Sequence, residues 1–243
     1  MVVKSKVKYI QSLSQKKHRE SERLFIAEGP KIINELLNDP RMEPVELFAI
    51  KSWLHDGALN SRATITEVDE VQLSRLSQLS TPNQVLGVFR MPEHGAFYPN
   101  STISLLLDNI QDPGNLGTIV RCADWFGVDQ VVCSRDCADI YNHKTVQSTM
   151  GSISRVKVFY EDLEKIIVDH PSVPVYAATL SGKNIKQMGA LKEGMILIGN
   201  ESRGISDDLI KLAHEQITIP RSGKAESLNA AVATGIILSR LVG

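Results

Sequence analysis

Three polar clusters in the sequence carry the side chains best suited to chemistry. The first runs from Asp108 to Arg121, the second from Gly199 to Gly204, and the third is Ser227-Leu228-Asn229. The apolar run from Met195 to Ile198, closed by Gly199, is typical of a strand buried on both faces. Loops that follow neighbouring buried strands form a ligand crevice at the carboxyl ends of those strands. The sequence therefore predicts a ligand site built from these clusters.

The signatures of several common enzymes are missing. No G-x-G-x-x-G follows an apolar run, and neither G-x-x-x-x-G-K-[ST] nor G-x-S-x-G occurs. Cys122, Cys133 and Cys137 lack paired metal spacing, and no histidine lies close enough in sequence to complete a zinc site. The sequence therefore disfavours a dehydrogenase, a P-loop NTPase and an esterase. It predicts no metal site, and its cysteines are expected to be reduced packing residues.

Charge is distributed unevenly along the chain. The whole sequence of 243 residues has a net charge of -1, and its length allows one or two domains. Residues 1–25 carry seven basic and two acidic residues, a net charge of +5. The basic residues are Lys4, Lys6, Lys8, Lys16, Lys17, Arg19 and Arg23. Such an arm indicates either a polyanionic partner or a solvated helix face.

The chain has no segment that suggests a membrane or an export signal. Its start lacks the apolar core of a signal peptide. The uncharged stretch from Ser227 to Ser239 is too short to span a bilayer. A cytoplasmic protein without a membrane partner is expected.

Residues 1–90 alternate between helical and extended patterns, which predicts a small α/β domain. Strands are expected at 23–27, 45–50, 63–65 and 85–89, with helices at 30–37, 51–59 and 71–79. Val3, Val7 and Ile10 recur at helical spacing, so an amphipathic helix that packs this stripe inward is expected first. Residues 91–102 are rich in proline and glycine with little periodicity, which predicts a linker.

Residues 103–243 alternate again, which predicts an α/β domain with a parallel sheet of about six strands. The strands are expected at 103–107, 130–133, 156–159, 173–178, 195–198 and 216–219. Helices are expected from Pro113 to about 126, at 144–150, at 163–168, and after Ser227, which is suited to cap the last one. That last helix is apolar almost all round, so burial on several sides is expected. Trp125 is expected in the core or in an interface.

In order, the three clusters match the signatures of a known family. They read Asn109-x5-Asn115-Leu116-Gly117-x3-Arg121, then Gly199-Asn200-Glu201-x2-Gly204-Ile205-Ser206, then Ile219-Pro220-x6-Ser227-Leu228-Asn229. The chain therefore resembles the SpoU/TrmH ribose 2′-O-methyltransferases of the SPOUT class. Lys17-x-Arg19 followed by Leu24 to Gly29 resembles the ribosomal-protein-like RNA-binding domain of many members. Ser202 departs from the pattern, since many members have glycine or alanine there.

The resemblance implies a fold and a cofactor that composition does not reveal. It implies a deep trefoil knot in the catalytic domain, and only the resemblance predicts it, because knots are otherwise essentially absent from proteins. S-adenosylmethionine is expected to bind within the knot, held by Gly199, Ile219 and Leu228, with Thr179 lining the same crevice. The family also implies a homodimer in which each active site is completed across the interface.

The resemblance also implies the catalytic residues. A ribose 2′-hydroxyl is a weak acid, so its attack on a sulfonium methyl requires loss of its proton or polarisation of its oxygen. Arg121 is a doubtful base because a guanidinium stays protonated. We expect it to grip the adjacent RNA phosphate and orient the hydroxyl. Asn115, Ser227 and Asn229 are expected to shape the ribose pocket, and Glu201 to hold its loop by accepting backbone hydrogen bonds. No metal is needed, since the leaving group is already an activated cation.

Each of these residues has a simpler interpretation, and two other functions stay open. Asn115 or Ser227 could only cap a helix, and Arg121 could only pair with a surface carboxylate. A non-catalytic RNA-binding protein would explain the basic arm, whereas a base methyltransferase of the same class would keep the fold. With the resemblance, Lys16, Lys17, Arg19 and Arg23 are expected to contact RNA, ribosomal RNA more than transfer RNA.

Overall fold

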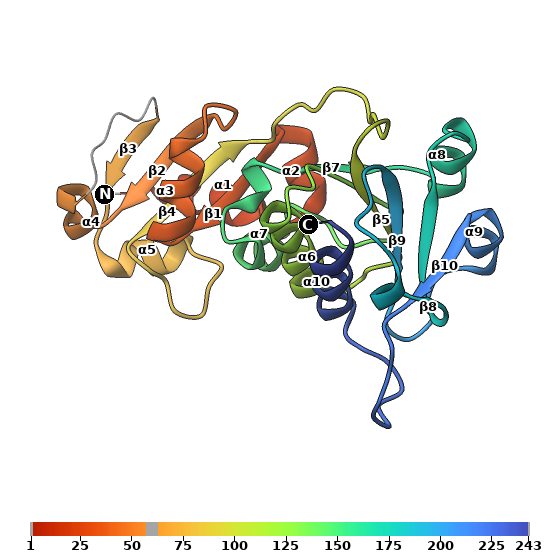
Figure 1. Cartoon of the computed structure of the whole chain (residues 1–243). Coiled ribbons are helices and arrows are strands. Elements are labelled where there is room, and N and C mark those ends of the chain that lie inside the picture. Colours follow the sequence, from red (N-terminus) through yellow and green to blue (C-terminus); the bar gives the residue numbers. More distant parts are fainter. Residues whose placement is uncertain (1, 57–62, 243) are drawn as a thin grey trace. The chain divides into compact units, whose positions relative to one another are not determined.

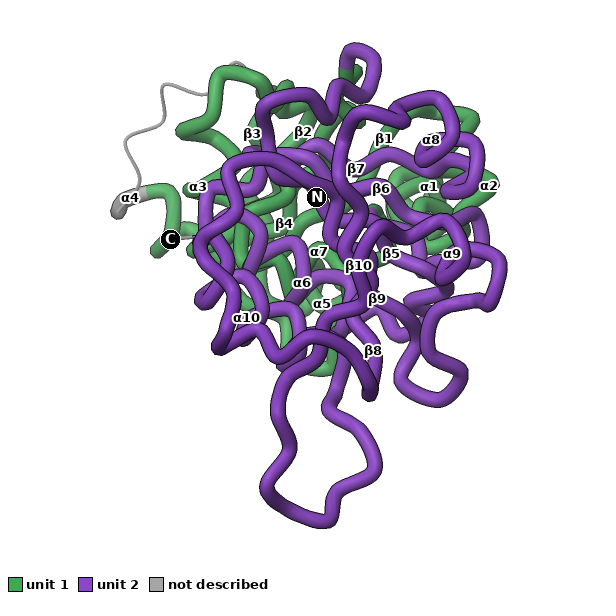
Figure 2. Tube along the Cα trace, turned by 45° about the vertical axis from the view of Figure 1, so that its right-hand side comes forward, with its two compact units in different colours: residues 1–94, 141–154 green, residues 95–140, 155–243 purple. Residues whose placement is uncertain are grey.

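The computed structural model describes residues 2–56 and 63–242 (Figure 1). The chain forms two compact units, coloured separately in Figure 2. Unit 1 contains residues 1–94 and 141–154, and unit 2 contains residues 95–140 and 155–243. Segment 141–154 therefore packs in unit 1, although in the chain it lies between two strands of unit 2. This segment falls inside residues 103–243, the range predicted for the methyltransferase domain. That domain assignment stays a prediction.

Unit 1 is built on a four-stranded mixed sheet. Its order is β1-β4-β2-β3, in which β4 is antiparallel to β1 and β2, and β3 is parallel to β2. The bounds are Leu24–Glu28 for β1, Pro44–Ala49 for β2, Thr64–Glu67 for β3 and Val85–Arg90 for β4. All of β1 is buried, as its apolar composition predicts. The four predicted strands are thus confirmed to within two residues.

The described residues of unit 1 form six helices. They are α1 (Lys4–Ser12), α2 (Lys16–Glu22), α3 (Pro30–Asn38), α4 (Lys51–Asp56), α5 (Glu70–Leu76) and α7 (His143–Thr149), followed by the 3-10 turn η1 (Ser152–Ser154). Pro30 opens α3, where its missing N–H costs no helical hydrogen bond. The predicted extension of α4 to residue 59 lies outside the described residues.

The predicted inward stripe of the first helix is wrong at one position. Ile10 is fully buried and Val7 is partly buried, but Val3 is 64% exposed. The reason is that α1 begins at Lys4, so Val3 is the N-cap residue and lies outside the helical repeat.

Unit 2 contains a six-stranded sheet in which every pair is parallel, as predicted. Its order is β10-β8-β9-β5-β6-β7. The bounds are Ile103–Asp108 for β5, Gln130–Cys133 for β6, Lys157–Tyr160 for β7, Val175–Asn184 for β8, Gly194–Gly199 for β9 and Glu215–Thr218 for β10. The central strands β5 and β9 contain the apolar runs Leu105 to Leu107 and Met195 to Ile198, and these residues are buried, as expected of strands covered on both faces.

The helices of unit 2 are α6 (Pro113–Trp125), α8 (Leu163–Asp169), α9 (Asp207–Leu212) and α10 (Ala230–Leu241), with a 3-10 turn η2 (Ile185–Gln187). α10 packs against α6, and the two lie side by side in Figure 1. The helix α9 was not anticipated from the sequence. Over the described ranges, no helix combines the length and the apolar character needed to cross a membrane.

The expectation that the last helix is buried on several sides is wrong within one chain. Ile237, Leu238 and Leu241 are buried, but Val232 is 51% and Ile236 is 38% exposed. Trp125, at the end of α6, is 82% exposed, so it is not a core residue. An apolar surface on α6 and α10 is therefore left uncovered in the single chain.

Candidate active site

One residue from each polar cluster joins a single hydrogen-bonded group. The side-chain N–H of Asn115 donates to the Glu201 carboxylate, and the Asn229 amide donates to Asn115 Oδ1 at 2.8 Å. These partners lie 86 and 114 positions apart in the sequence. We call Asn115, Glu201 and Asn229 the polar network. Three separate loops are brought together there, at the carboxyl ends of the strands.

Asn115 reaches the network from the first turn of α6. Its side chain does not cap that helix, because Asp112 is the N-cap and accepts a hydrogen bond from Asn115 N at 2.8 Å. The simpler interpretation of Asn115 as a cap is therefore wrong. Its amide is left to bridge the other two loops.

The loop that carries Glu201 is held by its neighbour Asn200. Asn200 Oδ1 accepts from the backbone N–H groups of Ser202 and Arg203, at 2.8 and 3.2 Å. The backbone of Asn200 also exchanges hydrogen bonds with Gly204, which has a φ of +72°. The role expected of Glu201, accepting backbone hydrogen bonds, is therefore taken by Asn200. Glu201 instead accepts from a side chain.

Gly199 is required by the tightness of the same loop. A Cβ atom at this position would lie 2.3 Å from the backbone carbon of Gly204, well inside contact distance. The loop also bonds to the one after β5. Asn200 Nδ2 donates to Asn109 O at 2.9 Å, and Ser206 N donates to Asp108 Oδ2 at 2.8 Å. The first and second clusters thus form one rigid pair.

Cys137 hydrogen-bonds to the backbone on both sides of the start of the first cluster. Cys137 Sγ accepts from Ile110 N and donates to Leu107 O, both at 3.2 Å. A hydrogen bond from Cys133 lowers the pKa of the Cys137 thiol to about 7. All three cysteines are free thiols, and Cys133 and Cys137 are buried, in agreement with a packing role. The contact of Cys137 was not anticipated, because nothing in its local sequence marks it. Asn200 lies within the second motif, but its role as the acceptor that holds the loop was not predicted.

The third cluster lies on a loop that projects from unit 2 between β10 and α10 (Figures 1 and 2). Every residue from 221 to 229 is exposed. Ser227 does not cap α10, contrary to the sequence prediction. Asn229 is the N-cap, and its Oδ1 accepts from Ala231 N and Val232 N at 3.0 and 3.2 Å. Within the described part of the chain, the Ser227 hydroxyl has no hydrogen-bond partner.

Among the described residues, Arg121 forms no hydrogen bond with the polar network. It is exposed on α6. Among residues 2–56 and 63–242 it forms no ion pair, so the interpretation as a surface ion-pair partner has no support. Its guanidinium is available to a ligand or to another chain.

The residues expected to bind the cofactor lie at the carboxyl ends of neighbouring strands. Between β8 and β10 the pairing shifts, because Ala177 pairs with Gln216 whereas Lys183 pairs with Ile217. Residues 178–182 therefore leave the ladder, and Thr179 lies within this bulge. Gly199 ends β9 and Ile219 follows β10, while Leu228 lies on the projecting loop and is 44% exposed. Backbone groups freed from the ladder are suited to hydrogen-bond an adenosine moiety.

Both parts of the chain match known families. Residues 102–239 match the SpoU rRNA Methylase family, and residues 4–87 match the MRM3-like substrate binding domain. The chain belongs to the SpoU rRNA methylase family. The resemblance drawn from the three motifs is therefore confirmed.

The similarity to individual SpoU relatives extends over nearly the whole chain. The 23S rRNA (guanosine(2553)-2'-O)-methyltransferase RlmP of Bacillus subtilis is 31% identical, covering 98% of this chain and 96% of the relative. A structure from Porphyromonas gingivalis, assigned to the TrmH family of RNA methyltransferases, is 32% identical with a TM-score of 0.89, covering 99% and 98%. An AdoMet-bound rRNA methyltransferase from Sinorhizobium meliloti is 30% identical with a TM-score of 0.87, covering 99% and 95%.

Of the four residues predicted to contact RNA, one is buried in the structure. Lys16, Lys17 and Arg23 are exposed, but Arg19 is only 3% exposed. Its Nη1 donates to Leu13 O at 2.9 Å and to Ser14 O at 2.6 Å. Arg19 therefore holds the turn between α1 and α2, and its prediction as an RNA contact is wrong. The described residues also contain no group of three His, Cys, Asp or Glu side chains arranged to hold a metal ion.

The cap assignment makes a direct prediction for this SpoU methylase. Asn229→Ala removes the α10 cap and one hydrogen bond of the polar network, so the free energy of unfolding is expected to fall by about 0.5–2 kcal/mol. Ser227→Ala is the matched control, and its effect is expected to stay within about 0.5 kcal/mol, because the hydroxyl is exposed. Urea denaturation of both variants measures the difference. A larger loss for Ser227→Ala would contradict the assignment.

Proposed function

We propose that this chain transfers the methyl group of S-adenosylmethionine to a ribose 2′-hydroxyl of ribosomal RNA. The polar network carries the proposal, since it joins one residue from each family motif at the carboxyl ends of the strands. Similarity to RlmP over 98% of the chain supports ribosomal RNA as the substrate.

Thr179, Gly199, Ile219 and Leu228 would hold S-adenosylmethionine, largely through backbone groups. Two features of this chain fit such a ligand: the bulge of residues 178–182 and the absence of space for a side chain at Gly199. When bound, the cofactor supplies a methyl group on a sulfonium, which is already activated. The reaction therefore needs no metal ion.

The residues of the chain position the hydroxyl and handle its proton. Asn115 and Asn229 shape the ribose pocket, and Glu201 fixes the orientation of the Asn115 amide by accepting its N–H. The exposed Ser227 hydroxyl is available to hydrogen-bond the ribose. Arg121 grips the RNA phosphate next to the target and orients the hydroxyl, while that phosphate helps to take the proton.

We further propose a homodimer in which each site receives Arg121 from the other chain. The exposed apolar side chains Trp125, Val232 and Ile236 on α6 and α10 support this, because burying them against a second copy would remove apolar surface from water. The exposure of Arg121, which has no hydrogen bond to the polar network of its own chain, is consistent with a role across that interface. A trefoil knot in the domain 103–243 and a cytoplasmic location complete the proposal.

The test combines cofactor binding with product analysis. Calorimetry is expected to detect S-adenosylmethionine binding by the intact chain. Incubation with a 23S rRNA transcript, digestion to nucleosides and mass spectrometry are expected to show a nucleoside methylated on its ribose. A base-methylated nucleoside would instead support the alternative SPOUT activity. RNA binding without cofactor binding would support a non-catalytic protein.

A further inference from the structure

Unit 1 contains a hollow lined by three arginines and two glutamates, here called the basic hollow; of its residues, only Arg23 has a role above, as an expected RNA contact. Its volume is about 310 Å³. It lies where β1 begins beside the end of β4: Met91 N donates to Arg23 O at 2.8 Å, and Leu24 pairs with Arg90. The lining residues are Arg23, Arg41, Glu43, Arg90, Met91, Pro92 and Glu93. Side chains distant in sequence thus converge on one concave surface.

Arg23 provides the cation that is not committed to a carboxylate. It ends α2 in the left-handed conformation, with a φ of 56°, and so turns the chain into β1. Its side chain is exposed, and within the described residues it has no hydrogen bond or ion pair. A guanidinium in this state keeps all of its N–H donors for a ligand.

The Arg90 side chain is held by one hydrogen bond and keeps further N–H donors. Its Nε donates to Glu43 Oε1 at 3.0 Å, and its side chain is 50% exposed. Within the described residues, only Nε of this guanidinium forms a side-chain hydrogen bond, so the Nη groups keep their donors. The exposed ion pair offsets part of the charge of both Arg90 and Glu43, so Arg90 contributes oriented donors more than net charge.

Arg41 is held even more firmly. Its Nε and Nη2 donate to the two oxygens of Asp39 at 2.9 and 2.7 Å. This contact lowers the pKa of Asp39 to about 2, so the carboxylate stays ionised and keeps the guanidinium in place. With Arg41 and Arg90 held in position before any ligand arrives, less side-chain entropy is lost on binding.

We propose that this hollow binds a phosphodiester group of the RNA substrate, mainly through Arg23 and Arg90. The planar guanidinium matches two phosphate oxygens, and such charge-assisted contacts are stronger than neutral hydrogen bonds. Glu93 opposes the anion and limits the gain for a small free phosphate. A polyanion also gains from the counterions it releases, so RNA is favoured over an isolated anion. The inference rests on the proposed function in that its ligand is the RNA substrate.

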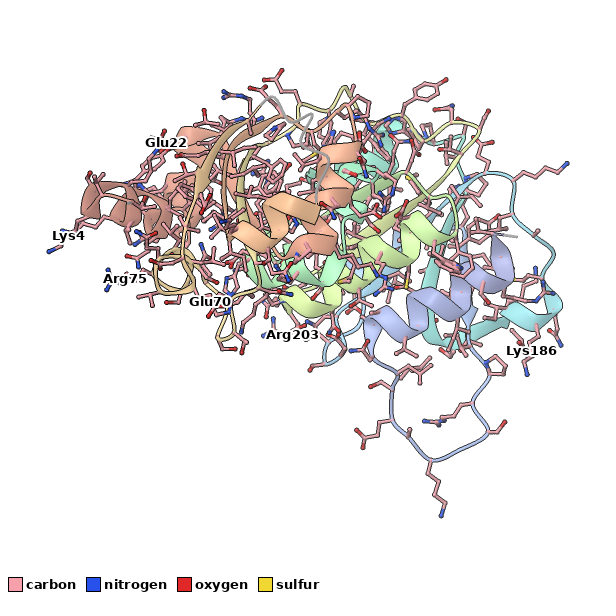
Figure 3. All side chains as sticks on the ribbon, turned by 90° about the vertical axis from the view of Figure 1, so that its left-hand side faces the viewer. Lys4, Glu22, Glu70, Arg75, Lys186 and Arg203 are labelled. Carbon is pink, nitrogen blue, oxygen red and sulfur yellow. The ribbon has the colours of Figure 1, made fainter. Side chains whose placement is uncertain are left out.

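The test compares the double variant Arg23→Gln/Arg90→Gln with Arg75→Gln. Arg75 is another exposed arginine of unit 1, labelled in Figure 3, and serves as the matched control for lost charge. Filter binding to a 23S rRNA transcript over a range of salt concentrations measures the affinity. The double variant is expected to bind about tenfold more weakly, with a log–log salt slope shallower by about 1 per lost phosphate contact. Arg75→Gln is expected to keep the wild-type slope.

A second variant with the opposite sign guards against an effect of unfolding. Glu93→Gln removes the opposing charge and is expected to tighten RNA binding several-fold, which a damaged protein would not do. With the double variant, the KM for RNA is expected to rise while kcat stays within about twofold, because the hollow acts in binding. Wild-type affinity and slope in the double variant, or weaker binding by Glu93→Gln, would overturn the inference.

These outcomes are separate from those of the proposed function. If the intact chain methylates 23S rRNA and the double variant binds RNA like the intact chain, only the hollow is excluded. If the intact chain neither binds nor methylates 23S rRNA, the proposed substrate itself fails.

Discussion

Arg121→Ala is expected to lower the rate of methyl transfer by a factor on the order of a hundred or more, the scale of positioned orienting and proton-transfer groups. S-adenosylmethionine affinity is expected to change little, because Arg121 lies on α6, whereas the residues proposed to hold the cofactor lie on or after β8, β9 and β10. Single-turnover kinetics together with calorimetry measure both quantities. Near-normal turnover would show that Arg121 has no part in the reaction.

A mixture of inactive variants tests whether Arg121 acts on the other chain. In a mixed dimer of Arg121→Ala and Asn115→Ala, one site would contain an intact Asn115 and the partner's intact Arg121. Random mixing is then expected to restore about a quarter of wild-type activity, since half of the dimers are mixed and each has one complete site. If both residues act within one chain, the mixture stays as inactive as each variant alone.

A chain that begins at Gly95 is expected to lose stable folding, and with it cofactor binding. Segment 141–154 would remain, but the rest of unit 1 would be gone. Val146 and Ile153, which belong to unit 1, are 0% and 3% exposed in the whole chain, and α7 contacts β1. Exposing such side chains costs about 1.5–3 kcal/mol each. Gln147 Nε2 would also lose its acceptor, Glu28 O, now 3.0 Å away.

Thermal unfolding followed by circular dichroism compares this shortened chain with the intact one. Supplying residues 1–94 as a separate chain serves as the control, and it is expected to restore part of the lost stability. A shortened chain that melts cooperatively at the wild-type temperature and binds S-adenosylmethionine normally would contradict the expectation. It would mean that segment 141–154 stays folded without packing against residues 1–94.

Much of the architecture follows from local sequence patterns. Uninterrupted apolar runs such as Leu105 to Leu107 and Met195 to Ile198 predict strands buried on both faces, because such a composition leaves no polar face for water. Pro30 and Pro113 mark helix starts for the steric reason that proline fits the first turn. The order of the three motifs was sufficient to identify the family.

Other features depend on residues far apart in the chain, and local patterns do not contain them. Ser227 and Asn229 are both good N-cap residues, and the structure has Asn229 as the cap of α10, where it also contacts Asn115, 114 positions away. Arg19 has the charge expected of an RNA contact, but its guanidinium donates hydrogen bonds to the carbonyl groups of Leu13 and Ser14.

The sequence by itself determined the strands, most of the helices and the family, and it predicted that three polar clusters form the site. Tertiary structure alone decided which of those side chains touch, where segment 141–154 packs, and which apolar residues of α10 stay exposed. The physical reason is that propensity and periodicity act over a few residues. The polar network, the bulge at 178–182 and the basic hollow arise where the folded chain brings distant segments together.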